Sequence, residues 1–157
     1  MPVLFGAVMA LIEERVELAS RGLDLGSSGP HVRDLLWAAM RGVDPSLPEA
    51  TPATWVDALD RVLERPRPGP RSGPHDTSPV DGEGSAAYAD DAHAAGWVPK
   101  ALYKTLLRIA IARDFATLAV NRAKCNVLAP AHMIADVDAL VAPLRAGQGG
   151  WGAGPSP

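Results

Sequence analysis

A proline- and glycine-rich stretch near the middle of the chain limits what this sequence can fold into. Residues 65–85 hold five prolines, four glycines and scarcely an apolar side chain. Such a segment buries too little apolar surface to offset the entropy lost on ordering. We therefore expect a flexible linker here, with polyproline II character near Pro66–Pro70. Folded regions are expected on either side, an N-terminal three-helix lobe over residues 1–64 and a C-terminal helical lobe over residues 86–146.

On both sides of this linker, apolar side chains recur every three or four residues, which is the period of an amphipathic α-helix. No stretch shows the two-residue alternation of a half-buried strand. The sequence therefore predicts an all-α protein, made of small helical bundles with about six helices. The expected helices cover residues 3–21, 30–41, 52–64, 86–95 and 99–125, with a last one that starts at Pro130 and is limited by Pro143. Glycine-rich residues 147–157 are expected to be a disordered tail.

Proline marks where two of these helices begin. Pro30 and Pro52 each stand at an expected first helical position, where a fixed φ and a missing N–H donor are both tolerated. Thr51 is the expected N-cap of the helix that starts at Pro52. The long helix over residues 99–125 is apolar on two sides, which is typical of a central helix. Its Leu106 and Ile109 are predicted to be core residues.

Composition narrows the class of protein further. The 157 residues are 47% hydrophobic and carry a net charge of −3, which is typical of a globular chain and argues against a dedicated nucleic-acid binder. Cys125 is the only cysteine, so neither an intramolecular disulfide nor a cysteine-based zinc site can form. Arginine far outnumbers lysine, and alanine, glycine and proline are plentiful, as in proteins from GC-rich bacterial genomes.

The ten residues from Val3 to Ile12 carry no polar side chain. No basic residue precedes them and no convincing cleavage site follows, so we interpret them as part of a helix and not as a signal peptide. They are too few to span a bilayer, and we expect a soluble, cytoplasmic protein without a membrane role. Because they cover more than one helical face, one neighbouring helix cannot bury them all. The candidate interaction surface comprises Val3, Leu4, Val8, Leu11 and Ile12.

No nucleotide-binding or catalytic motif is present, and we expect no cofactor. Asp90 and His93 would share a face of the predicted helix over residues 86–95, and with His132 they suggest a small metal-dependent enzyme. A di-metal bundle needs a second carboxylate–histidine pair on a facing helix. None is found, so a solvated polar face is the favoured interpretation. Cys125 is predicted to be a structural cysteine at a helix C-terminus, where the helix dipole raises a thiol pKa.

Two stretches resemble known families. Residues 25–36, continuing to Thr54–Trp55, are similar to a peptidoglycan-binding helical repeat, although Leu36 stands where that family has glutamine and the Asp-Gly turn is missing. Residues 86–140 resemble the histone-fold layout of a short, a long and a short helix, with Lys100 and Lys124 roughly where that fold has basic residues. This second resemblance implies a DNA-associated helical module. Neither match is long enough to assign a family.

The leading functional hypothesis is a non-catalytic helical adaptor or accessory subunit. It would act through protein–protein contacts, either with a partner or with a second copy of the chain. The supporting features are the apolar opening segment, the two-sided long helix and the lack of convergent titratable groups. The alternatives are the DNA-associated module and the metal-dependent enzyme.

Overall fold

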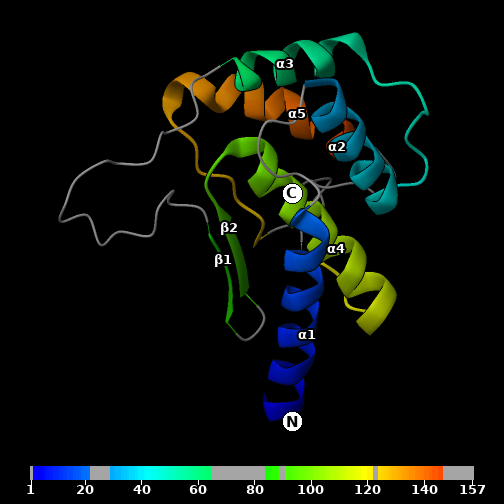
Figure 1. Cartoon of the computed structure of the whole chain (residues 1–157), viewed down its shortest axis with the longest axis vertical. Helices are drawn as coiled ribbons and strands as arrows, with labels where there is room; N and C mark the ends of the chain where they lie inside the picture. The colour runs from blue at the N-terminus through cyan, green and yellow to red at the C-terminus, as the bar shows by residue number, and fades with distance from the viewer. Residues whose placement is uncertain (1, 22–28, 65–83, 89–90, 122–123, 147–157) are drawn as a thin grey trace, which may run out of the picture.

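The computed structural model describes residues 2–21, 29–64, 84–88, 91–121 and 124–146. Within these residues the protein is mostly helical, which confirms the predicted fold class, and one two-stranded sheet is added (Figure 1). The elements are α1 (Pro2–Ser20), α2 (Gly29–Val43), α3 (Ala53–Leu63), β1 (Gly84–Tyr88), β2 (Asp91–Ala95), α4 (Val98–Ala116), a 3-10 turn (Ala131–Met133) and α5 (Ile134–Ala146). The expected tail and most of the expected linker lie outside the described residues.

The apolar stripes of α2 and α3 form as the sequence predicts. Val32, Leu36 and Met40 of α2 are fully buried, and they lie four residues apart on one helical face. Pro52 is the N-cap of α3, with φ −61° and ψ 141°, so this helix begins one residue later than expected. The buried side of α3 consists of Trp55, Ala58, Leu59 and Val62.

One hydrophobic core joins helices from both halves of the chain. Its buried side chains come from α2, the loop that follows α2, α3, α4 and α5: Val32, Leu36, Trp37, Met40, Val43, Leu47, Trp55, Ala58, Leu59, Val62, Tyr103, Leu106, Leu140 and Leu144. Leu106 is fully buried, and Ile109 packs half-buried against the same cluster. The two expected lobes therefore pack on each other, a point that the sequence leaves open.

Polar contacts fix α3 against α5. The indole N–H of Trp55 donates a buried hydrogen bond of 2.9 Å to the carbonyl of Leu140. Its ring also meets the edge of Trp37, with centroids 5.2 Å apart. Arg61 forms an ion pair of 2.7 Å with Asp136, which raises the pKa of the arginine. These directional contacts orient the two helices side by side (Figure 1).

The long central helix is shorter than the sequence predicts, because α4 ends at Ala116 and not near Cys125. Thr117 takes a left-handed conformation with φ 53°, and its amide caps the carbonyls of Ala112 and Arg113. The guanidinium of Arg113 donates to the carbonyls of Gly42 and Val43 at the end of α2. These contacts with α2 accompany the end of the helix at a point where the apolar pattern alone would continue it.

The expected helix over residues 86–95 is wrong. This segment forms the antiparallel hairpin of β1 and β2, with Gly84 opposite Ala95 and Tyr88 opposite Asp91. A ten-residue helix is marginal by itself, whereas the hairpin pairs its backbone and lies beside α1 and α4. Gly96, at φ 122°, then turns the chain into α4. With a hairpin in place of the short helix and a shortened α4, this half of the chain departs from the histone-like layout.

The last helix also differs from expectation at both ends. Pro130 precedes the 3-10 turn, and α5 begins only at Ile134. Pro143 lies inside α5, which continues to Ala146. Of the apolar stripe that the sequence predicts, Val137, Leu140 and Val141 are buried and Ile134 is exposed, and Leu144 beyond Pro143 is buried as well. Burial of that stripe against α3 accompanies continuation of the helix past a residue that cannot donate a backbone hydrogen bond.

Candidate interaction surface

In the described part of the N-terminal half, the large apolar side chains that are exposed lie on α1. It packs against α4 and lies beside β1, and its N-terminal end points away from α3 and α5 (Figure 1). The exposed fractions are 87% for Val3, 62% for Leu4 and 47% for Leu11. These three members of the expected surface are therefore available to a partner.

A fourth exposed side chain, Leu18, extends this surface along the helix. It is 54% exposed and follows Leu4 and Leu11 at intervals of seven residues. Seven residues are close to two helical turns, so the three side chains share one side of α1. We call Leu4, Leu11 and Leu18 the leucine face. The sequence interpretation missed Leu18, although its heptad spacing was a signal that could have found it.

The other two expected surface residues face inward. Val8 is half-buried, and Ile12 is fully buried with Val16 and Ala112 in a small apolar cluster between α1 and α4. This cluster is separate from the main core. The opposite sides of α1 therefore have different roles, because one packs against α4 and the other is exposed.

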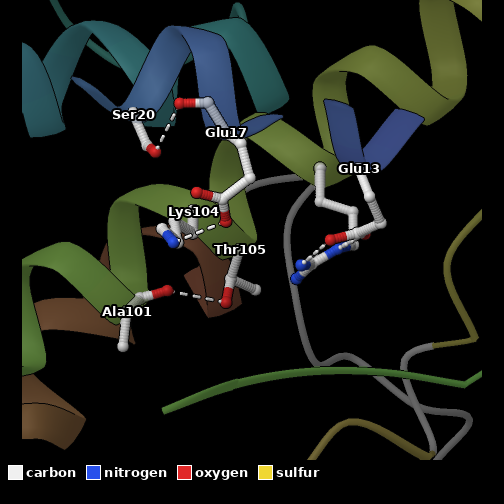
Figure 2. Close-up of polar contacts among 7 residues, drawn as sticks. Glu13, Glu17, Ser20, Ala101, Lys104 and Thr105 are labelled. Atoms are coloured by element: carbon white, nitrogen blue, oxygen red, sulfur yellow. Dashed lines mark hydrogen bonds and ion pairs between the residues drawn. The ribbon is translucent and has the colours of Figure 1, made fainter. Parts of the chain in front are cut away.

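Two ion pairs flank this small cluster and run along the contact between α1 and α4. The ammonium of Lys104 donates to Glu17 at 2.6 Å, and Figure 2 shows these two side chains pointing toward each other. The guanidinium of Arg108 makes two parallel bonds to the carboxylate of Glu13, of which the Nη2–Oε2 bond is 2.7 Å long. Only 9% of each basic side chain is exposed.

The two pairs are buried to different depths, because 19% of the Glu13 side chain but 49% of the Glu17 side chain is exposed. A buried ion pair adds direction more than net stability. Desolvation of the two charges offsets much of their attraction, but removal of one partner leaves a buried charge without compensation. A bidentate arginine–carboxylate pair is also geometrically specific. Glu13 and Glu17 therefore set how α1 docks on α4, and they occupy two basic side chains that a DNA-associated function would otherwise have free.

A cation–π contact also joins α1 to the end of α4. The guanidinium of Arg15 lies over the ring of Phe115, 4.4 Å from its centroid. Phe115 is 44% exposed. A cation over an aromatic face is stabilising even at partly exposed sites, so Arg15 helps to hold α1 against the C-terminal turn of α4.

Among the described residues considered for catalysis, none belongs to a group that could hold a metal ion. Asp90 lies outside the described residues, as does most of the expected linker, whose last two residues, Gly84 and Ser85, belong to β1. His93 is exposed on β2 and His132 is exposed in the 3-10 turn. In the described part of the chain, no three His, Cys, Asp or Glu side chains are grouped so that they could hold a metal ion.

The only cysteine is half-buried and poorly suited to nucleophilic attack. Burial raises the pKa of the Cys125 thiol above its ordinary value, so less of the reactive thiolate is present at neutral pH. The direction agrees with the sequence prediction but the cause is burial, because α4 ends nine residues earlier, at Ala116.

Comparison with known proteins finds no protein-family model, no curated protein and no solved structure that matches this chain. A further observation concerns membranes. None of the helices in the described ranges is long and apolar enough to cross a bilayer.

Proposed function

We propose that this protein is a non-catalytic helical adaptor or accessory subunit of the bacterial cytoplasm that binds another protein surface through the leucine face of α1. The observation that carries the proposal is the exposure of Leu4, Leu11 and Leu18 on one side of a helix whose other side is fixed to α4. Large apolar side chains grouped on one surface mark protein contacts more often than isolated ones do.

The way in which α1 is held on α4 suits a helix that offers the leucine face for binding. The ion pairs of Glu13 and Glu17 hold α1 in one orientation, so the leucine face needs little ordering when it binds, and preorganisation raises affinity by lowering the entropic cost of association. Burial of a leucine side chain contributes roughly 1.5–3 kcal/mol. Three leucines with partial exposure can therefore stabilise an assembly by several kcal/mol before the costs of association.

The test is a pair of charge substitutions on the leucine face. Leu4→Glu with Leu11→Glu should abolish association, as measured by sedimentation velocity of the protein alone and with any isolated partner, while the helical circular dichroism signal is retained. Leu128→Glu is the matched control, because Leu128 is 97% exposed and lies outside α1. The proposal fails if the double substitution leaves association unchanged, or if it removes helicity to the extent that Ile12→Glu does.

A further inference from the structure

Helix α4 ends at a residue that is poorly suited to end a helix. Thr117 has φ 53° and ψ 26°, and among the described residues it is the only one besides glycine with a positive φ. The left-handed conformation disfavours a residue with a Cβ atom by a factor on the order of 10, and threonine is branched at that atom as well. Helices usually place glycine or asparagine here. A strained backbone of this kind persists only where surrounding contacts hold it in place.

The local sequence does not explain why α4 ends at Ala116. No glycine or proline occurs from residue 117 to residue 129, and Leu118 and Ala119 are strong helix formers. In the structure, residues 118–121 nevertheless belong to no helix. The end of α4 must therefore depend on contacts that the residues after Ala116 make elsewhere.

Leu118 makes such a contact. In a continuous helix its amide would bond to the carbonyl of Asp114, four residues earlier. It donates instead to the carbonyl of Ala112, six residues earlier, at 3.0 Å. The chain is thus folded back along the last turn of α4, and the side chain of Leu118 packs against the small apolar cluster between α1 and α4.

Helix α1 supplies most of what Leu118 packs against. Two of the three buried side chains in this cluster, Ile12 and Val16, belong to α1. A straight continuation of α4 would carry Leu118 about 9 Å beyond Ala112 along the helix axis. Figure 1 shows that the C-terminal end of α4 lies apart from the N-terminal end of α1. The left-handed turn therefore keeps Leu118 in a cluster that α1 completes.

The main core does not depend on α1. Its buried side chains come from α2, α3, α4, α5 and the loop after α2. Removal of α1 from α4 would leave this core complete, whereas the small cluster would keep only Ala112 of its buried side chains. The two ends of the contact therefore differ, because the core can outlast the departure of α1 and the strained turn cannot.

We propose that docked α1 is what keeps α4 short. When α1 leaves α4, Leu118 loses its packing, Thr117 relaxes from the left-handed to the helical conformation, and α4 extends at least to Asn121. Docking of one helix thereby sets the length of the other, as in a two-state switch. The inference goes beyond the proposed function, because it does not depend on what binds the leucine face.

The experiment follows single residues of the full chain by nuclear magnetic resonance. Ile12→Glu places a charge in the small cluster and should release α1, which is seen as rapid hydrogen exchange of α1 amides. The carbon-13 shifts of residues 117–121 should then move to helical values, and hydrogen exchange at residues 119–121 should slow about tenfold. Ala10→Glu adds the same charge at an exposed position of α1 and should change neither.

A second substitution tests the strain at Thr117. Glycine accepts the left-handed conformation without a steric penalty and is a weak helix former. Addition of Thr117→Gly to Ile12→Glu should therefore restore the short α4 and remove most of the slowing at residues 119–121. Equal slowing in the two variants would show that relief of strain at Thr117 does not drive the extension.

Leu118→Ser tests the same coupling while α1 remains docked. Serine forms helix less readily than leucine, so helical shifts at residues 118–121 in this variant would come from the lost packing. We expect those shifts, together with slow exchange of α1 amides.

Two results would overturn the proposal. One is an Ile12→Glu chain in which α1 amides exchange rapidly while residues 118–121 keep their wild-type shifts. The other is a Leu118→Ser chain in which α4 still ends at Ala116. If Ile12→Glu does not fold or does not release α1, the result with Leu118→Ser decides by itself.

Discussion

Leu106 offers the most direct test of the core that joins the two halves of the chain. Its side chain is fully buried in α4, among residues that come from α2, α3 and α5. Leu106→Ala removes the transfer free energy of a buried side chain, roughly 1.5–3 kcal/mol. A cavity remains as well, because helices tied by the bond from Trp55 to Leu140 cannot collapse freely. Together these terms should lower the free energy of unfolding by about 2–5 kcal/mol.

The assay is urea denaturation followed by far-ultraviolet circular dichroism, with the slope of the transition compared between variants. Leu128→Ala is the matched control, because the same atoms are removed from a side chain that is 97% exposed. That change should stay within about 0.5 kcal/mol. A loss below about 1 kcal/mol for Leu106→Ala would show that α4 contributes little to the shared core, and the description of one core would be wrong.

Two further predictions concern α1 and the cysteine. Glu13→Ala leaves Arg108 buried without its acceptor, which should cost the docked state of α1 about 3 kcal/mol and speed hydrogen exchange of α1 amides on the order of 100-fold. The control is Glu14→Ala, at an exposed position of the same helix, which should change hydrogen exchange little. Equal effects of the two substitutions would contradict the role of the ion pair. Because burial raises the pKa of Cys125, its alkylation rate should reach half-maximum at a higher pH than that of a cysteine in an unfolded peptide, and a midpoint at or below the peptide value would show that the thiol is not desolvated.

The helices whose apolar side chains share one face were predictable from sequence. Val32, Leu36 and Met40 repeat at helical spacing and are buried on one side of α2. Trp55 and Leu59 do the same in α3. Local pattern succeeds here because each helix has one buried face, and the period of that face is a property of the helix alone.

The hairpin and the end of α4 were not predictable from helical periodicity. Alanines around His93 favour a helix locally, but the segment pairs with β1 and forms a strand. The end of α4 at Ala116 coincides with the contacts between Arg113 and the carbonyls at the end of α2, some 70 residues away. Propensity is a weak prior where such tertiary contacts decide the conformation.

The candidate surface was predicted in part. The apolar composition of α1 identified Val3, Leu4 and Leu11, which are exposed. This composition could not show that Ile12 faces inward, because a helix that is apolar on every side does not reveal which side is buried. The side of α1 that faces α4 is set by Glu13 and Glu17, whose basic partners lie 95 and 87 residues further along the chain. A sequence alone does not reveal which of many charges will pair over such separations.

The contacts between α3 and α5 have a consequence for how the protein is made. The bond from Trp55 to Leu140 joins residues 85 apart in the chain, and the bond from Arg61 to Asp136 joins residues 75 apart. A ribosome adds about 5–20 residues per second, so synthesis from Trp55 to Leu140 takes about 4–17 s. During the first part of that interval the buried sides of α2 and α3 have no α4 to cover them, and until its end they have no complete α5. The nascent chain must therefore carry exposed tryptophan and leucine side chains until its last helix is made, which makes it a substrate for chaperones that bind apolar segments.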